Sequence, residues 1–302
     1  MATRLVWRGD FLPLDLFIIE LDPNPSIQEI QESMTHMEQR KTLLVSNDDG
    51  YQSYFLRTLV DALCAHFEVF VVAPRDEQSW VGRAMSRSGI LEAEALSDWP
   101  CPAWSVSGRP ADCVNIALHH LLPRRPDAVI SGMNLGFNVT LPLTLSSGTV
   151  AAATEGALAG LPSIAFSLSI PRADFFKVSK ARGERDEEGN KVTGIAAHHA
   201  ADMTLNLLGQ DHPPFTVHNI NFPENVAEDS KICRTTMTLS EIPSLFRLVE
   251  PSHEEGNARF TFEFASEWQH QYKPYHADIE ALKRGEISHT VLRWDRLSED
   301  AQ

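Results

Sequence analysis

The sequence predicts an α/β fold of the three-layer, doubly wound kind, with a mostly parallel sheet between two layers of helices. Short apolar runs that read as buried strands alternate along the chain with segments of helical periodicity, beginning with 43–45 and 51–67. Several of these runs end in polar or glycine residues, which are typical of the turns that follow strands. This alternation favours parallel strands with helices on both faces of the sheet.

The elements follow in order from residue 41. The apolar run Leu43-Leu-Val45 predicts the first strand, and Tyr51 to Phe67 carries apolar residues at helical spacing. Further strands are expected at 68–74, 103–108, 127–132, 163–168 and 215–221, and further helices at 113–122, 147–159 and after 193. The charged, glycine-interrupted stretch 171–193 is expected to be a mobile surface loop.

Two segments near the C-terminus predict a hairpin. Residues 246–250 and the strictly alternating residues 259–264 flank the turn Glu254-Glu-Gly-Asn257. We therefore expect a long hairpin arm at about 244–266. Because a projecting hairpin is poorly stable alone, an intersubunit role is expected for it.

Residues 1–40 stand apart from this pattern, because the first convincing core strand begins at Thr42. We expect 1–40 to be a dispensable N-terminal extension and 41–302 to be the main domain. The alternative is a docked arm held by the apolar cluster from Leu12 to Leu21.

Composition excludes several classes of function. The chain has 302 residues with 26 Lys and Arg against 41 Asp and Glu, a formal net charge of −15, which argues against binding to a nucleic acid duplex. No apolar run reaches the roughly 18 residues that span a bilayer, so no membrane association is expected. The four cysteines show no close pairing and the N-terminus lacks the order of a signal peptide, so we expect reduced thiols and a cytoplasmic protein.

Two adjacent carboxylates, Asp48 and Asp49, follow the first strand and precede Gly50. Adjacent side chains on a strand point to opposite faces, so the two acids share a point only if the chain leaves the strand there, and Gly50 permits such a turn. Two anions held together are costly unless a cation lies between them, and oxygen ligands suit Mg²⁺, Mn²⁺ or Ca²⁺. In isolation such a pair is more typical of an ordinary Asx turn with solvated acids.

Three other polar groups also follow predicted strands or open a helix. Ser79 is a hydroxyl ligand suited to a hard cation, and Asn134 offers a neutral carbonyl oxygen. Ser147-Gly-Thr149 presents N–H groups and hydroxyls at the start of a helix, which suits phosphate. Each group alone is more typical of a loop, a turn or a helix cap. Because the strands that precede them are predicted to be parallel, however, the groups should meet at one edge of the sheet.

Together these groups resemble the SurE family of metal-dependent nucleotide phosphatases, and the resemblance covers about residues 41–297. The motifs that carry it are Val45-Ser-Asn-Asp-Asp-Gly50, Val71-Val-Ala-Pro74 with Ser79, Ser107-Gly-Arg-Pro-Ala-Asp-Cys113, Ser131-Gly-Met-Asn134 and Ser147-Gly-Thr-Val-Ala-Ala-Ala153. The resemblance implies a SurE-like fold that releases phosphate from nucleoside monophosphates and sometimes from short polyphosphate. It also implies a homodimer or homotetramer built through the C-terminal hairpin.

The resemblance also implies roles for individual residues. One divalent ion, Mg²⁺ or Mn²⁺, is expected on Asp48, Asp49, Ser79 and Asn134. Phosphate is expected on Asn138, Ser147, Gly148 and Thr149. The chain departs from the family pattern at 80–86, which is bulkier and more basic, and at 138–146, which looks one residue longer, so the nucleobase preference does not follow from the resemblance.

The expected mechanism has a divalent ion that polarises the phosphoryl oxygens and lowers the pKa of a water. One of the two catalytic residues, Asp48 or Asp49, would orient or deprotonate that water while the other acts mainly as a ligand. An aspartyl-phosphate intermediate is the competing route.

Two other classes of protein place adjacent acids after a strand. A receiver-like signalling domain needs a Lys after its fifth strand, yet no Lys follows 163–168 until Lys177. A zinc-dependent amide hydrolase needs histidine ligands, and His119-His120 and His198-His199 lie within helical patterns, away from the strand ends. Dependence on Mg²⁺ or Mn²⁺ would favour the phosphatase.

Overall fold

The central strands are buried on both faces, which is why their sequences form unbroken apolar runs. β1 (Thr42–Ser46) is buried throughout, and β2 (Glu68–Pro74) is buried except at its first residue. The computed structural model describes residues 40–241, 244–254, 257–264 and 277–297, so the expected extension 1–40 lies outside the described residues except for Arg40. The chain from Lys41 to Gln302 forms one unit.

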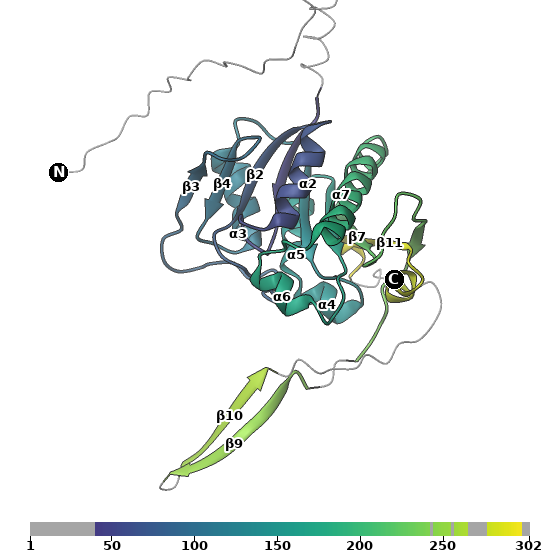
Figure 1. Cartoon of the computed structure of the whole chain (residues 1–302). Coiled ribbons are helices and arrows are strands. Elements are labelled where there is room, and N and C mark those ends of the chain that lie inside the picture. Colours follow the sequence, from purple (N-terminus) through teal and green to yellow (C-terminus); the bar gives the residue numbers. More distant parts are fainter. Residues whose placement is uncertain (1–39, 242–243, 255–256, 265–276, 298–302) are drawn as a thin grey trace, which may run out of the picture. The chain divides into compact units, whose positions relative to one another are not determined.

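Nine strands form one sheet in the order β3-β4-β2-β1-β5-β6-β7-β11-β8. Figure 1 labels β3, β4 and β2 toward one end of this sheet and β7 and β11 toward the other. The other strands are β3 (Ala93–Leu96), β4 (Ala103–Val106), β5 (Ala128–Leu135), β6 (Ser163–Leu168), β7 (Thr216–Phe222), β8 (Ile232–Thr235) and β11 (Ile287–Arg293). Neighbours run parallel except β3 with β4 and β7 with β11. Strand order reverses at β1, because β2 lies on one side of it and β5 on the other. Doubly wound sheets bind ligands at the carboxyl ends of the strands beside such a reversal.

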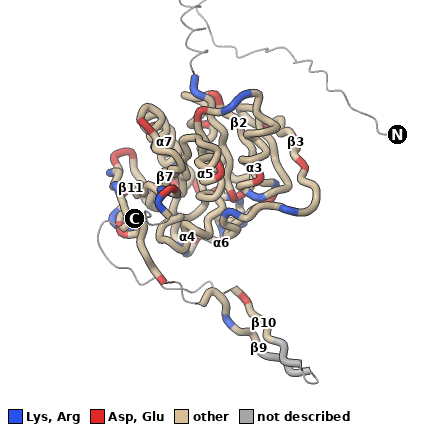
Figure 2. Tube along the Cα trace, turned by 180° about the vertical axis from the view of Figure 1, so that it is seen from behind, with Lys and Arg blue, Asp and Glu red and all other residues tan. Residues whose placement is uncertain are grey.

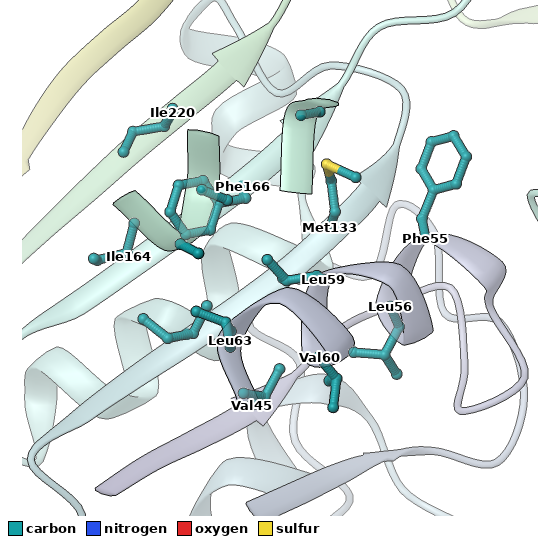
Figure 3. Close-up of a cluster of buried hydrophobic side chains, with 14 of the residues drawn as sticks. Val45, Phe55, Leu56, Leu59, Val60, Leu63, Met133, Ile164, Phe166 and Ile220 are labelled. Atoms are coloured by element: carbon teal, nitrogen blue, oxygen red, sulfur yellow. The ribbon is translucent and has the colours of Figure 1, made fainter. Parts of the chain in front are cut away.

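Helices cover both faces of this sheet. They are α2 (Tyr54–Cys64), α3 (Pro110–Ile116) continued by the π-helical turn η1 (Ala117–Leu121), α4 (Leu141–Ser146), α5 (Gly148–Leu158), α6 (Phe175–Lys180), α7 (Glu187–Leu208), α8 (Asp278–Lys283) and the short 3₁₀ turn η2 (Trp294–Arg296). Val45 packs with residues of α2 and α7 in one core cluster (Figure 3), whereas its neighbour Leu44 packs with residues of α3 and α5 in another. The predicted three-layer α/β fold is confirmed.

Helix α5 lies directly against β5 because its side chains are small. A Cβ added at Gly156 would lie 2.5 Å from the Val129 side chain, and Ala152 and Ala153 are fully buried. The helix begins at Gly148, with Ser147 as its N-cap. This close packing fixes the N-terminus of α5 at the edge of the sheet where the candidate residues were expected to meet.

The expectation of a mobile loop at 171–193 is wrong. The segment forms α6 and the beginning of α7, where the Asp186 side chain accepts a hydrogen bond from the Gly189 N–H at 2.9 Å. Asn190 bonds the backbone N–H and carbonyl of Arg185, both at 3.0 Å. A capped helix start with acids in its first turn has the same charged composition as a solvated loop, which is why composition misled the prediction.

The predicted C-terminal hairpin is confirmed. β9 (Phe246–Glu254) and β10 (Asn257–Phe264) pair antiparallel, with Phe246 opposite Phe264 and Leu248 opposite Phe262. All four side chains are at least half exposed. The strands extend several residues closer to the turn than the alternation indicated.

The four cysteines are all among the described residues. Cys64, Cys101, Cys113 and Cys233 form no disulfide. In the part of the chain that the structure describes, no helix is long and apolar enough to cross a membrane.

Candidate functional site

The acid pair lies in a tight turn directly after β1. Asn47 donates a hydrogen bond from Nδ2 to the Gly50 carbonyl at 2.9 Å, and Gly50 has a φ of +89°. A Cβ on Gly50 would lie 3.4 Å from the backbone carbon of Asp76 in the loop after β2. The prediction that glycine permits this turn is confirmed.

The turn sends the two carboxylates to different neighbours. Asp48 is buried and accepts a hydrogen bond from the Thr149 hydroxyl at 2.5 Å. Asp49 is half-buried and accepts one from the Leu135 N–H at 2.8 Å. Asp48 therefore faces the start of α5, and Asp49 faces the end of β5.

The surroundings favour the protonated form of both acids. Burial raises the pKa of Asp48 to about 6, although hydrogen bonds from the Thr149 hydroxyl and N–H oppose the rise. Burial, together with the charge of Asp48, raises the pKa of Asp49 well above its ordinary value. Among the described residues, no Lys, Arg or His forms a salt bridge with either acid. Two acids held close together without a cation are the electrostatic arrangement that a bound divalent ion would relieve.

The N-terminus of α5 approaches Asp48 closely. A Cβ at Gly148 would lie 2.7 Å from the Asp48 Cβ, so only glycine fits here without displacement. The Ser147 hydroxyl oxygen accepts a hydrogen bond from the Val150 N–H at 3.0 Å as the helix cap. Ser147, Gly148 and Thr149 thus lie together beside Asp48, as predicted, although Thr149 uses its hydroxyl on the acid.

Asn134 lies near the end of β5, and Asn138 lies in the segment that follows this strand. Both side chains are buried. The Asn138 N–H donates to Asn221 Oδ1 at 2.7 Å, and its Nδ2 donates to the Ser167 hydroxyl at 2.9 Å. Its carbonyl accepts from Asn219 Nδ2 at 2.7 Å. Asn138 is therefore held in a buried amide network at the ends of β6 and β7, which the sequence did not predict.

Ser79 lies in the exposed loop after β2, and its hydroxyl donates to Glu77 Oε1 at 2.7 Å. The charge of Glu77 raises the pKa of both Asp48 and Asp49, which places this carboxylate near the pair. Sequence reasoning missed Glu77 because a charged residue in a polar loop has the pattern of an ordinary solvated side chain.

The loop that carries Ser79 is fixed to α5. The Gly82 N–H donates to the Ser146 carbonyl at 2.8 Å, just before the helix begins. Arg83 bonds the buried Glu155 carboxylate from Nη2 at 2.6 Å and from Nε at 3.0 Å. Asn115 donates to the other oxygen of Glu155 at 2.9 Å. This buried acid, unlike Asp48 and Asp49, has a cationic partner.

Three histidines form a separate row at β7 and β11, in which His218 and His289 are buried and His212 is partly exposed. His289 on β11 and His218 on β7 are joined by their ring nitrogens at 2.9 Å, and His218 Nε2 lies 3.3 Å from His212 Nδ1. Arg234 Nη1 lies 3.3 Å from His289 Nδ1 and 3.2 Å from His289 Nε2, and His212 Nε2 lies 2.7 Å from the Leu207 carbonyl. The row therefore runs from an arginine, which only donates hydrogen bonds, to a carbonyl, which only accepts them.

This row does not form a metal site, since His218 directs its two nitrogens toward two different rings. Burial, with the neighbouring histidines and Arg234 adding to it, lowers the pKa of His218 to about 3. Burial and Arg234 lower that of His289 to about 4. Within the described ranges, no three His, Cys, Asp or Glu side chains are arranged to hold a metal ion. A cation at the acid pair would therefore rely on two carboxylates and neutral oxygens.

The chain is similar in sequence and structure to known proteins over most of its length. The family model described as "Survival protein SurE" matches residues 43–242. The "5'-nucleotidase SurE" of Sorangium cellulosum is 34% identical over 263 residues, which cover 85% of this chain and 91% of that protein. The protein of the same name from Cytophaga hutchinsonii is 48% identical over 199 residues, covering 64% and 70% of the two chains. The crystal structure of the SurE protein from Aquifex aeolicus superposes with a TM-score of 0.64 at 28% identity, covering 85% of this chain and 95% of that chain.

Proposed function

Because this chain belongs to the SurE family, we propose that it is a metal-dependent phosphatase that hydrolyses nucleoside monophosphates to nucleoside and phosphate. The observation that carries the proposal is the pair of cation-free acids at the carboxyl end of β1, beside the N-terminus of α5. Relatives that match 91% of their length to this chain carry the name 5'-nucleotidase, which supports a phosphoric monoester as substrate. Short polyphosphate is a second substrate class for the same site.

The donor set at this edge of the sheet suits a hard divalent ion. Asp48 and Asp49 would hold it with carboxylate oxygens, and Ser79 and Asn134 would add neutral oxygens. Hard oxygen ligands favour Mg²⁺ or Mn²⁺ over Zn²⁺, which takes nitrogen and sulfur more readily. When bound, the ion supplies Lewis acidity to the phosphoryl group and to water.

The other residues would bind and orient the phosphate. Ser147, Gly148 and Thr149 lie at the positive end of the α5 dipole, where an anion is stabilised. Asn138 would close the cradle from the β5 side, held in place by the amide network. One carboxylate would orient the attacking water or take its proton. Asp49 fits that role better than Asp48, because Asp48 already accepts two hydrogen bonds from Thr149.

The hairpin supports a homodimer or homotetramer. Apolar side chains are exposed along the paired strands β9 and β10, including Phe246, Leu248, Phe262 and Phe264. A two-stranded ribbon is marginally stable alone, and an exposed apolar row of this kind marks an interaction surface. We infer that a second copy of the chain covers it.

The remaining expectations concern the substrate, the compartment and the domain boundary. Figure 2 shows Lys and Arg distributed among Asp and Glu along the trace, and with a net charge of −15 this supports a small-molecule substrate over a nucleic acid duplex. Free thiols support a cytoplasmic location. The family match begins at residue 43, which supports a phosphatase domain at 41–302 preceded by an extension at 1–40.

A phosphate-release screen tests this proposal. The full chain, freed of metal with a chelator, is assayed on nucleoside monophosphates and short polyphosphate with Mg²⁺, Mn²⁺ or Zn²⁺ added in turn. We expect release from nucleoside monophosphates that requires Mg²⁺ or Mn²⁺. Amide hydrolysis with Zn²⁺ in place of phosphate release, or no release from any nucleotide, would contradict the proposal.

A further inference from the structure

A cavity of about 220 Å³ opens directly beside Asp49. Asp49 and Gln52 line it, and the loop after β2 contributes Glu77. A further wall is formed by the end of α6, which contributes Lys180, and by the turn between α6 and α7, which contributes Arg182. The segment expected to be a mobile loop is therefore one wall of a cavity at the candidate site.

This wall is fixed to α2. The Arg182 carbonyl accepts a hydrogen bond from the Tyr54 N–H at 2.8 Å, at the first residue of that helix. The Gly183 N–H donates to the Val178 carbonyl at 2.9 Å, and Val178 is buried. A Cβ at Gly183 would lie 3.1 Å from the Phe55 ring. The turn thus has a defined position relative to the acid pair.

The size of the cavity limits what it holds. Pockets for drug-sized ligands begin at about 300 Å³, so 220 Å³ accommodates one ring of a nucleotide and not the whole molecule. If the phosphoryl group lies at the acid pair, the ring nearest to Asp49 is the sugar attached to that group. This step rests on the proposed function.

The chemistry of the lining points to the same part of the substrate. Its residues are polar or charged except for Leu135 and glycines, and none is aromatic, so a base would find no ring to stack on. Three cations (Arg75, Lys180 and Arg182) and three acids (Asp49, Asp76 and Glu77) line the cavity, and none of these cations forms a salt bridge with Asp49. Arg75 also lies 3.7 and 3.5 Å from the carboxylates of Glu92 and Glu94. The lining has no surplus of positive charge for a second phosphate, and its hydrogen-bonding groups suit hydroxyls.

We propose that this cavity binds the ribose of the substrate and that Gln52 and Arg182 hydrogen-bond its hydroxyls. The turn between α6 and α7 is then a specificity element that selects ribose-bearing phosphate esters. A hydroxyl held by the charged donor Arg182 supports about tenfold discrimination against the analogue that lacks it, and one held by the neutral amide of Gln52 supports less.

The test compares ribose 5-phosphate, 2-deoxyribose 5-phosphate and p-nitrophenyl phosphate, none of which carries a base. The variants are Q52A and R182N, since asparagine tolerates the positive φ of position 182. K177N on α6, an exposed lysine outside the cavity lining, is the matched control. For each protein kcat and KM are measured with metal, and calorimetry records the binding of ribose 5-phosphate without metal.

We expect wild type and K177N to prefer ribose 5-phosphate over the deoxy sugar by about tenfold in kcat/KM, through KM. In the variant that removes the donor to the 2-hydroxyl, Q52A or R182N, this ratio should approach one and calorimetric affinity should fall by a similar factor, with p-nitrophenyl phosphate turnover unchanged. Equal loss on all three substrates, or a sugar ratio unchanged in both variants, would overturn the ribose site. Failure of wild type to release phosphate from nucleoside monophosphates in the same assay would instead overturn the proposed function.

Discussion

Two clusters of titratable side chains lie at different places on the same sheet. The free-energy cost of removing these groups from water is offset in a different way in each cluster. In the row His212–His218–His289, every ring has polar partners, and the row ends at Arg234 and at the Leu207 carbonyl. Asp48 and Asp49 have hydrogen-bond donors but no salt bridge to a cation in the described part of the chain, and each is held close to another acid. A closed row needs no ligand, whereas the acid pair has charge left to neutralise. A structural cluster differs from a candidate site less in how deeply its side chains are buried than in whether their charges and hydrogen-bonding groups have partners.

Substitutions of Asp48 and Asp49 test the difference between the two clusters most directly. Replacing Asp48 or Asp49 by Asn removes a carboxylate while keeping an oxygen acceptor for Thr149 or Leu135. We expect phosphate release to fall about 100- to 10,000-fold in each variant, the range typical of losing one acid–base group. The control is D61N, an exposed aspartate on α2, which should keep wild-type turnover. Near-normal activity of both site variants at saturating metal would remove the acids from the mechanism.

The same substitution should stabilise the metal-free protein. Burial raises the folded pKa of Asp48 to about 6 from 3.8, so at pH 7 the ionised carboxylate makes an unfavourable contribution. We expect D48N to raise the free energy of unfolding by about 1–3 kcal/mol at pH 7, measured by urea denaturation with chelator present. The gain should shrink as pH falls through 6, because the wild-type acid then takes up a proton. A loss of stability at pH 7 would show that the pair is structurally satisfied without a cation.

The histidine row should respond to pH in the opposite sense. Its folded-state pKa values lie below the unfolded value of 6.5, so the unfolded chain takes up protons that the folded chain refuses. The stability it supplies is present above pH 6.5 and is lost as pH falls toward 4. H218Q keeps a hydrogen-bond donor and an acceptor but does not titrate. The difference in free energy of unfolding by which wild type exceeds H218Q should therefore decrease by about 2 kcal/mol when the pH is lowered from 6.5 to 5. Unfolding curves at the two pH values that give the same deficit would show that the rings are not held neutral.

The smallest effect is expected at Glu155, a buried acid that has a cation. E155Q loses its ion pair with Arg83, which is 43% exposed, so we expect a destabilisation of only about 1 kcal/mol. E155Q is thus expected to lower the free energy of unfolding, whereas D48N is expected to raise it, because the Glu155 charge is paired with Arg83. Turnover should fall less than tenfold, since the loop that carries Ser79 remains bonded to the Ser146 carbonyl through Gly82. E68Q, which breaks an exposed ion pair with Arg124 away from the site, is the matched control.

Much of the fold was predictable from the sequence for a physical reason. β1 and β2 are buried on both faces, so their apolar runs are visible without any knowledge of their neighbours. β3 and β8 were missed because they are short and mostly exposed and carry no such run. The segment 171–193 was misread because Asp186 and the acids after it form a helix start with the composition of a loop.

The candidate site was predictable only where chemistry and local sequence coincide. Asp48, Asp49 and Gly50 are adjacent, and Ser147-Gly-Thr149 opens a helix, so each motif is visible by itself. The histidine row joins residues up to 77 positions apart, from 212 to 289, and no local pattern links them. The cavity wall at Arg182 likewise reaches the site only through its contact with α2.

The central claim is that the acid pair holds a divalent cation, and a titration tests it most directly. Metal-free wild type, D48N and E155Q are titrated with Mn²⁺ or Mg²⁺ in a calorimeter. We predict that wild type and E155Q bind with similar affinity, and that D48N binds more weakly by more than the ~10- to 100-fold that loss of an outer partner costs. Equal affinity of D48N and wild type would contradict the account.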